Sequence, residues 1–399
     1  MKINHKYYFT LTIIFASLHF VIGQNIWTQK ANFGGGNRWE TVGFAIGTKG
    51  YFAIGDSFQD LWEYDPTSNV WTQKANFGGA GTSETISFVI GSKAYIGEGL
   101  GAALSGNDFW EYDQATNIWT QKTSWGVWLE DHSAFSIGNK GYICGGWDAT
   151  QIRSELREYD TLTDTWTLKA NIPNAKWGAV TFTIGNFAYM GTGFDSTSGA
   201  SGASKDFWKY DPSIDTWTQI SDFGGSPRRE AVAFTINGKG YVGTGISGST
   251  LYNDFWEYTP ATDSWVQVAD LTTTGRAIAG SFAIGNKGYA GTGMDSAGNS
   301  FQDFWEFSPP LNIGINEIKG KDLINIFPNP FSLQATITFA EEQKNTIIKI
   351  TDVLGKEIKT VIFTGRQFVL DKAEMKAGIY FVQTTDEQKN ISKTKIVIE

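Results

Sequence analysis

The chain has 399 residues, a formal net charge of −9 and a single cysteine, Cys144. An acidic chain lacks the basic footprint that nucleic-acid binding requires, so we expect no nucleic-acid partner. One thiol forms neither an internal disulfide nor a cysteine metal cluster. A domain of roughly 300 residues buries about 75% of its unfolded surface and needs no disulfide.

The first 23 residues have the pattern of a secretory signal peptide. Two lysines precede an apolar run over residues 7–22, and a glycine ends it. This run is short for a membrane span of about 20 residues. We therefore expect residues 1–23 to be removed on export, so that the mature chain begins near Gln24 without a transmembrane segment. An uncleaved membrane anchor is the alternative.

A six-residue motif, typified by DFWEYD, recurs six times at intervals of 47 to 51 residues. Each copy is preceded by a phenylalanine and, seven residues after it, a tyrosine, as in Phe44 and Tyr51. A tryptophan strand such as residues 118–121 follows the first five copies. Short aromatic runs with this period predict a β-propeller with four strands per blade. The copies begin at Asp60, Asp108, Glu155, Asp206, Asp254 and Asp303.

The two ends of this repeat complement each other. The sixth copy has no tryptophan strand after it, whereas the tryptophan strand of residues 27–31 has no motif before it. Unpaired strand edges favour association with another strand. We therefore predict that residues 27–31 complete the last blade and close an all-β, six-bladed propeller over residues 24–308.

The connections between strands differ in how much they vary. From the tyrosine of the second strand to the start of the third strand the spacing ranges from 9 to 17 residues, whereas the phenylalanine-to-tyrosine spacing is always seven. In an up-and-down blade, the second-to-third and fourth-to-first connections emerge on the same face. We call this the variable face. Binding sites usually lie on loops held by a rigid scaffold, so we expect function there.

The copies resemble kelch repeats. The resemblance rests on a glycine pair that ends the second strand, a tyrosine-aspartate that ends the third, and a tryptophan about six residues later. The glycine pair is Gly145-Gly146 in the third copy but mostly Gly-Thr-Gly elsewhere, so the set is divergent. Some kelch-like propellers are copper oxidases that need several histidine ligands. Beyond residue 23 this chain has only His132, so we expect no such site, no metal and no cofactor.

The composition changes after residue 310, because all 16 tryptophans precede residue 306. Short alternating strands joined by polar turns predict a small Ig-like β-sandwich over residues 321–399, after a linker of residues 309–320. An ordinary sandwich of this fold would carry no functional message.

This tail resembles the type A C-terminal sorting domain of the type IX secretion system. The resemblance rests on the FPNP opening at 327–330, the DVLGK turn at 352–356, and the AGIYFV strand at 377–382. It implies Sec export, transfer across the outer membrane by the type IX machinery, and removal of the tail. The propeller would then be secreted or attached to the cell surface.

Charged residues recur at matching positions just before the first strand of each copy, near the expected mouth of the central channel. We expect acids and bases to alternate there. Salt bridges between blades would explain this pattern. Some kelch-like propellers instead resemble sugar mutarotases, which handle an acidic sugar, and Arg38, Glu40, Arg228, Glu230 and Arg276 match them in residue type. The full sets are Glu40, Glu84, Asp131, Gly178, Glu230 and Ile278, and Arg38, Thr82, Leu129, Lys176, Arg228 and Arg276.

Eleven of the 16 tryptophans occupy repeat positions and form blade core. The other five lie in connections of the variable face. Indole rings beside carboxylates suit the stacking of sugar rings or protein hot spots, although they can also cap the core. His132 follows Asp131 without a nucleophile motif, so it is either a hydrogen-bonded loop histidine or part of this site. The candidate ligand-binding residues are Trp39, Trp125, Trp128, Asp131, His132, Trp147 and Trp177.

These patterns together predict a secreted or cell-surface propeller that binds an extracellular carbohydrate or protein through its variable face. Catalysis is not indicated by any motif. Two alternatives stay open from the sequence: a mutarotase-like or epimerase-like enzyme acting on an acidic sugar at the channel mouth, and a structural adhesion component.

Overall fold

The computed structural model describes residues 26–79, 82–101, 108–127, 129–198, 202–271, 274–309, 324–353, 355–373, 375–387 and 391–399. The secondary structure of these residues is all β, and they contain no helix of the length and apolarity that a membrane span needs. The chain divides into two compact units, Met1–Pro310 and Leu311–Glu399. The predicted signal peptide, and the predicted linker after its first residue, lie outside the described residues, and their boundaries stay predictions.

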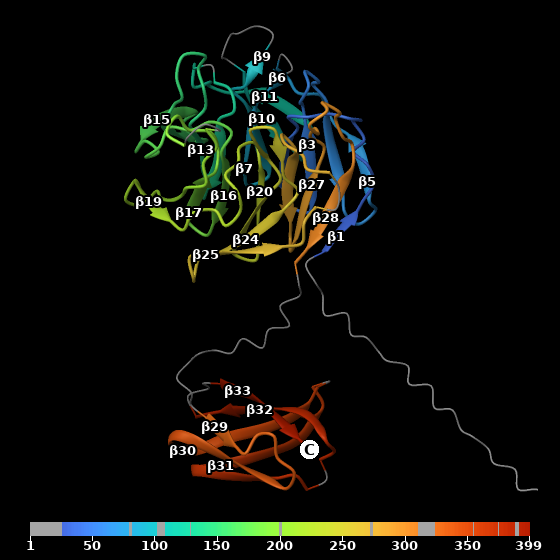
Figure 1. Ribbon diagram of the computed structural model, residues 1–399, viewed down its shortest axis with the longest axis vertical. Coiled ribbons are helices and arrows are strands. Elements are labelled where there is room, and N and C mark those ends of the chain that lie inside the picture. Colours follow the sequence, from blue (N-terminus) through green and yellow to red (C-terminus); the bar gives the residue numbers. More distant parts are fainter. Residues whose placement is uncertain are drawn as a thin grey trace, which may run out of the picture. The chain divides into compact units, whose positions relative to one another are not determined.

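Six four-stranded antiparallel sheets form the blades of the first unit (Figure 1). Blade 1 contains β2 (Val42–Ile46), β3 (Lys49–Ala53), β4 (Leu61–Asp65) and β5 (Val70–Gln73), and blade 2 contains β7 (Ile86–Ile90), β8 (Lys93–Gly97), β10 (Phe109–Asp113) and β11 (Ile118–Gln121). Blade 3 contains β12 (Ser133–Ile137), β13 (Lys140–Cys144), β14 (Leu156–Asp160) and β15 (Thr165–Lys169), and blade 4 contains β16 (Val180–Ile184), β17 (Phe187–Gly191), β18 (Phe207–Asp211) and β19 (Thr216–Ile220). Blade 5 contains β20 (Val232–Ile236), β21 (Lys239–Gly243), β24 (Phe255–Thr259) and β25 (Ser264–Val268), and blade 6 contains β26 (Gly280–Ile284), β27 (Lys287–Gly291), β28 (Phe304–Ser308) and β1 (Ile26–Gln29). Two short pairs, β6 (Thr82–Ser83) with β9 (Leu100–Gly101) and β22 (Ile246–Ser247) with β23 (Thr250–Leu251), lie in the connections.

The first strands of the blades form the inner ring of the propeller. Each of them contacts the first strands of both neighbouring blades, in the order β2, β7, β12, β16, β20, β26 and back to β2. Side chains alternate between the two faces of a strand, and Phe44 on β2 pairs across the sheet with Tyr51 on β3. Their rings stack with centroids 5.0 Å apart. The phenylalanine-to-tyrosine spacing of seven therefore sets the register of this hairpin.

Neighbouring blades are joined by aromatic side chains. Phe282 of blade 6 packs against Gly50 of blade 1, where a Cβ atom would lie 2.1 Å from the phenyl ring, so a side chain there is excluded. The fourth-strand tryptophans donate their indole N–H to a carbonyl of the preceding blade, as Trp119 does to Ala75 O at 2.9 Å. The repeated tryptophans thus link blades as well as fill them.

The N-terminal strand closes the ring. β1 pairs antiparallel with β28, and Trp27 lies opposite Phe307. Trp27 is 8% exposed, and its indole N–H donates to Ala269 O of blade 5 at 2.9 Å. The predicted closure and the six-bladed all-β fold are confirmed.

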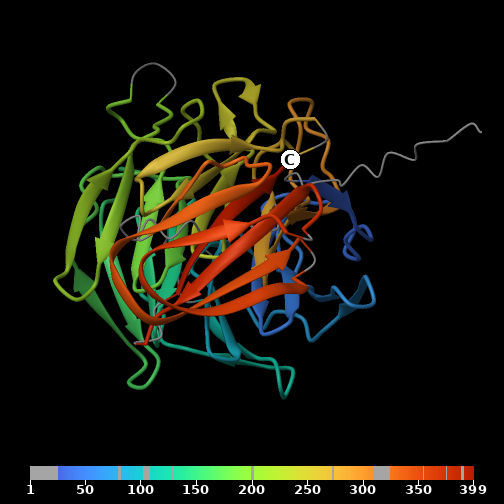
Figure 2. The same cartoon turned by 90° about the horizontal axis from the view of Figure 1, so that it is seen from below.

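The C-terminal unit is a five-stranded antiparallel sheet, shown from orange to red in Figure 2. The paired strands β30 and β31 shift register twice between Thr338 and Thr346, where bulges bend the hairpin. Its apolar residues, among them Ile337, Ile350 and Val382, form one core. This arrangement is compatible with the predicted β-sandwich. The strands are β29 (Ile324–Phe327), β30 (Gln334–Asp352), β31 (Glu357–Asp371), β32 (Gly378–Thr385) and β33 (Ile391–Ile398).

Candidate functional site

Six residues at matching positions form a ring at the mouth of the central channel. Each lies two residues before the first strand of its blade and has a left-handed φ between 49° and 60°. Backbone hydrogen bonds link most of the ring, such as Glu230 N to Gly178 O at 2.8 Å and Ile278 N to Glu230 O at 3.1 Å. A β-branched residue such as Ile278 is strained in this conformation, so the ring is imposed by its surroundings. The ring residues are Glu40, Glu84, Asp131, Gly178, Glu230 and Ile278.

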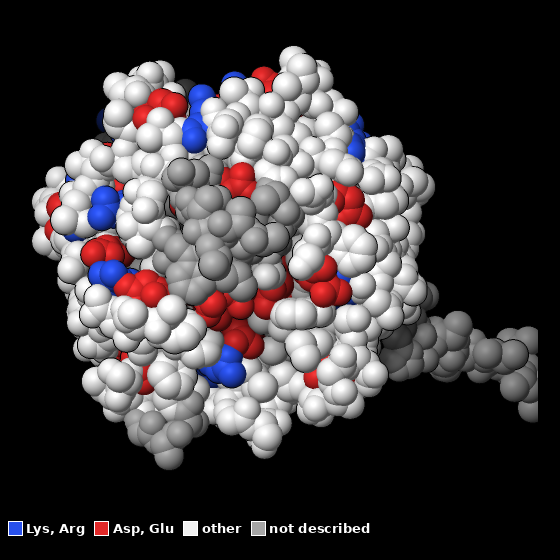
Figure 3. Space-filling view, turned by 90° about the horizontal axis from the view of Figure 1, so that it is seen from above, with Lys and Arg blue, Asp and Glu red and all other residues white. Residues whose placement is uncertain are grey.

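The ring surrounds a pocket with a volume of about 180 Å³. One water molecule takes up about 30 Å³ in the liquid, so the pocket has room for one small polar ligand. Figure 3 shows that aspartate and glutamate side chains gather at the centre of this face. The residues that line the pocket are Glu40, Thr41, Val42, Glu84, Thr85, Asp131, His132, Gly178, Ala179, Glu230, Ala231, Ile278 and Ala279.

The pocket wall is polar on one side and apolar on the other. The residue that follows each ring position is Thr41, Thr85 or His132 in blades 1 to 3 but an alanine in blades 4 to 6. Six buried polar atoms of the polar side have no hydrogen-bond partner among the described residues. A buried polar atom left without a partner costs about 1–3 kcal/mol, so these atoms favour a polar ligand. They are Glu40 Oε2, Glu84 Oε2, Thr41 Oγ1, Thr85 Oγ1, and both ring nitrogens of His132.

Glu40, Glu84 and Asp131 hold their protons more tightly than usual. Burial, together with repulsion from Asp131, raises the pKa of Glu40 and of Glu84 to about 8. Burial also raises the pKa of Asp131 to about 6, although the nearby Arg229 opposes this rise. Burial lowers the pKa of His132 to about 3, so its imidazole is neutral at physiological pH. At neutral pH the pocket therefore carries negative charge and exchangeable protons together.

Replacement of Glu84 by glutamine should reduce the pH dependence of stability. Because the pKa of Glu84 is about 8 in the folded chain against an ordinary 4.5, the folded state binds more protons between these values, and stability falls as the pH rises through this range. We expect Glu84→Gln to be more stable than the parent by about 2 kcal/mol at pH 9, a reduced figure because the mouth is open to solvent, and equal to it at pH 4. Calorimetric melting at both pH values measures this difference. Glu341→Gln, at an exposed position of the other unit, is the control. If stability depends on pH in Glu84→Gln as it does in the parent, the raised pKa of Glu84 is contradicted.

The arginines of the matching set do not reach the mouth. Arg38, Arg228 and Arg276 are all 0% exposed and lie within their blades. Arg228, for example, donates to Asp254 Oδ1 at 2.6 Å, to Asp254 Oδ2 at 3.0 Å, and to Thr244 O at 2.9 Å. The structure thus differs from the predicted alternation of acids and bases, because acids line the opening while these bases form ion pairs inside single blades. The three pairs are Arg38 with Asp60, Arg228 with Asp254 and Arg276 with Asp303.

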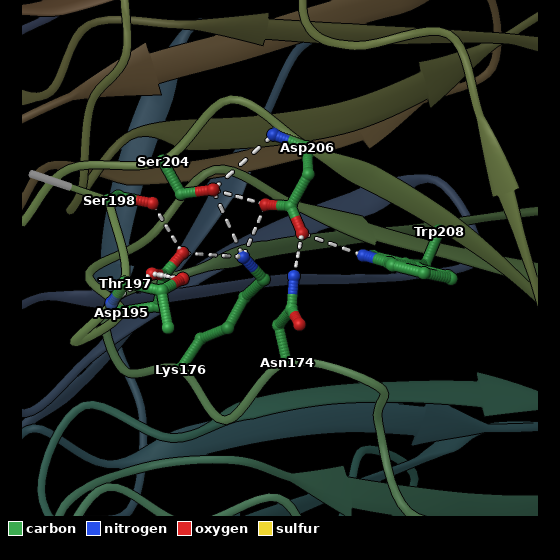
Figure 4. A network of polar contacts seen from close by, with 8 residues as sticks. All are labelled: Asn174, Lys176, Asp195, Thr197, Ser198, Ser204, Asp206 and Trp208. Carbon is green, nitrogen blue, oxygen red and sulfur yellow. Dashed lines mark hydrogen bonds and ion pairs between the residues drawn. The ribbon is translucent and has the colours of Figure 1, made fainter.

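Blade 4 uses a lysine where these blades use arginine (Figure 4). The ammonium of Lys176 contacts Asp206, lies 3.1 Å from Ser204 Oγ, and lies 3.5 Å from Asp195. Asn174 Nδ2 donates to the second oxygen of Asp206 at 2.9 Å, which replaces the second arm of an arginine. The long second-to-third connection of this blade therefore supplies groups that bury a lysine.

The five loop tryptophans have different environments. Trp125 is buried, with the guanidinium of Arg157 4.8 Å from its ring, so it is part of the blade packing. Trp177 lies between Phe194, 5.0 Å away, and the guanidinium of Arg229, 4.6 Å away. Trp39 is half-buried, and Trp128 lies outside the described residues.

Trp147 is the loop tryptophan best placed to contact a ligand. It is 36% exposed, and its backbone pairs with Glu130, the neighbour of the ring residue Asp131. Trp147 N donates to Glu130 O at 3.0 Å, which places the backbone of Trp147 next to the residue that precedes Asp131, although Trp147 is not among the residues that line the pocket.

The structure brings together some candidates and adds others. Asp131, His132, Glu40 and Glu230 line one pocket, as the repeat positions suggested. Arg229, Thr41 and Thr85 were not among the candidates. The threonines could have been found in the aligned copies, since the position after the ring is polar in copies 1 to 3 and alanine in copies 4 to 6. No group of three His, Cys, Asp or Glu within the described part of the chain is arranged to hold a metal ion.

Comparison with known proteins agrees with this architecture. Residues 131–312 match the family model described as KLHDC2/KLHL20/DRC7 Kelch-repeats domain, and residues 325–399 match the Secretion system C-terminal sorting domain. The solved structure of YjhT has a TM-score of 0.57 and 17% identity, over 68% of this chain and 95% of that chain, which shows the fold alone.

A curated relative, the endo-acting ulvan lyase of Formosa agariphila, is 32% identical over 90 residues. These residues make up 22% of this chain and only 17% of the length of that protein. The sorting domain indicates type IX export to the cell surface or outside the cell. The chain is a β-propeller protein that carries a kelch-repeat domain at residues 131–312 and a type IX C-terminal sorting domain at residues 325–399.

Proposed function

We propose that this exported propeller binds an extracellular carbohydrate at the acidic mouth of its channel. The observation that supports this most strongly is the set of six buried polar atoms without partners around one pocket of about 180 Å³. Sugar hydroxyls both donate and accept hydrogen bonds. Carboxyl groups, threonine hydroxyls and a neutral imidazole have the same double capacity, so they suit a ring of hydroxyls.

The indole of Trp147 gives this pocket a second kind of contact. The flat ring is 36% exposed on a residue whose backbone pairs with Glu130, the neighbour of Asp131, so the C–H face of a sugar that extends from the pocket can stack on it. Trp177 is less suited to stacking, because Phe194 and Arg229 already occupy its neighbourhood. We therefore assign the aromatic platform to Trp147.

The charges disfavour an acidic sugar. Glu40, Glu84 and Asp131 face the pocket, whereas Arg38, Arg228 and Arg276 are held in buried ion pairs. A sialylated or uronic-acid ligand would meet carboxylates without these arginines. The mutarotase alternative on an acidic sugar therefore has no support from these contacts, and a protein ligand or a structural adhesion role becomes an outcome of the test.

A glycan array tests the proposal with the full chain and two variants. We expect the parent to bind a defined glycan that is not acidic, and Trp147→Ala to weaken this binding at least tenfold while the melting temperature changes by less than about 2 °C. Leu162→Ala is the control, since this exposed residue lies between β14 and β15 on the opposite face. A blank array with folded protein, or binding that is unaffected by Trp147→Ala, would refute the assignment.

A further inference from the structure

The charge of the mouth identifies the kind of sugar more closely. On the basis of the proposed function, we infer that the pocket takes a sugar bearing a primary ammonium group, held by Glu40, Glu84 and Asp131 together with His132. The polar side would therefore select amino sugars over neutral and acidic ones.

The pocket has an excess of acids over bases. Glu40, Glu84, Asp131 and Glu230 line it, and Glu130 and Asp56 lie close enough to repel the first three of these groups in part. The basic group that acts on Asp131 is Arg229. Arg229 is already bonded to Glu230 and lies over Trp177. It therefore neutralises Glu230 of blade 5 rather than Glu40 and Glu84 of blades 1 and 2. A cationic ligand would offset the repulsion that opposes ionisation of the other three acids.

A second observation is independent of the acids. His132 is 7% exposed, lines the pocket, and has no partner on either ring nitrogen among the described residues. Thr41 is 5% exposed and its hydroxyl also lacks a partner there. An ammonium group has three donors and no acceptor. A neutral imidazole, a hydroxyl and carboxylates from adjacent blades offer it acceptors.

Other cations fit these contacts less well. Within the described residues no three acids or histidines are arranged to hold a metal ion, whereas an ammonium group needs only one to three acceptors at hydrogen-bond distance, such as a carboxyl group, the imidazole and a threonine hydroxyl. A neutral sugar would satisfy the hydroxyl and imidazole but would bring no positive charge to Asp131 and the two glutamates. The raised pKa values of Glu40 and Glu84 add a consequence, since a bound cation favours their charged forms and so releases protons.

Calorimetric titration of the full chain tests this inference with two matched probes, a glucosamine tetramer and an N-acetylglucosamine tetramer. At pH 6 we expect the glucosamine tetramer to bind at least tenfold more tightly than the N-acetylglucosamine tetramer. Because protons are released, the observed binding enthalpy should differ measurably between two buffers of different ionisation enthalpy. Glu84→Gln should weaken the glucosamine tetramer at least tenfold, whereas the exposed control Glu341→Gln should leave it unchanged. Nα-acetyl-lysine amide, which carries a primary ammonium group on its side chain but no sugar, should bind at least tenfold more weakly than the glucosamine tetramer.

Each of the other outcomes refutes one part of the inference or the proposed function. Equal affinity for the two tetramers, or affinity unchanged by Glu84→Gln, refutes the ammonium contact but leaves carbohydrate binding intact. Equal binding of Nα-acetyl-lysine amide refutes the sugar as source of the ammonium and points to a lysine of a protein. If neither tetramer binds while a neutral glycan does, the inference fails alone, and if no glycan binds, the proposed function fails with it.

Discussion

Trp27→Ala is expected to destabilise the propeller by about 3–5 kcal/mol, as large-to-small replacements of buried tryptophan do. Trp27 packs against Phe255 and Phe307 with ring centroids 4.7 Å and 5.0 Å away, and its N–H bonds to blade 5. The strand that carries it is the fourth strand of blade 6, so weakening its packing exposes the edge of β28. At roughly 2–4 °C per kcal/mol, the melting temperature should fall by about 10 °C.

The control for this effect is Trp147→Ala, which removes an equally large but exposed ring. Its melting temperature should stay within about 2 °C of the parent, because surface substitutions change stability by only about 0.5 kcal/mol. Deletion of residues 24–31 should act in the same direction as Trp27→Ala and more strongly. An unchanged melting temperature for Trp27→Ala or the deletion would contradict closure by the N-terminal strand.

Arg228→Ala should also cost about 3–5 kcal/mol, because it leaves Asp254 charged and half-buried without its partner. The guanidinium also lies 4.1 Å from the Tyr252 ring and 4.8 Å from the Phe223 ring, so packing is lost with the charge. Chemical denaturation of parent and variant measures the difference.

The adjacent residue provides a matched control. Arg229 has a side chain that is 26% exposed, and it pairs with Glu230 at the edge of the mouth, so Arg229→Ala should cost at most about 1 kcal/mol. If Arg228→Ala instead melts like the parent and loses ligand, Arg228 belongs to a binding or catalytic site and the structural assignment is wrong.

Much of the fold could be predicted from the sequence because each blade corresponds to one copy of a sequence repeat. Six copies of one motif fix the number of blades, and the unmatched tryptophan strand at Trp27 specifies how the ring closes. Hydrophobic periodicity sets which side chains of a strand face the core. The role of Gly50 could not be read in this way, since only the packed neighbour Phe282 explains why a side chain is excluded there.

The candidate site was predicted in part. Matching positions correctly grouped Glu40, Asp131 and Glu230 around one opening, because repeats place equivalent residues at equivalent radii. The direction of a side chain is not specified by its position, so Arg38, two residues before Glu40, turns into the blade toward Asp60. The loop tryptophans differ in exposure for the same reason, since Trp125 packs under the guanidinium of Arg157 whereas Trp147 is exposed.

A crystal structure of the full chain soaked with a glycan selected on the array tests the site itself. We expect sugar density in the pocket between Glu84, Asp131 and His132, with one ring against the indole of Trp147. Density confined to another face, with the channel mouth free of sugar, would contradict the assignment of carbohydrate recognition to this pocket.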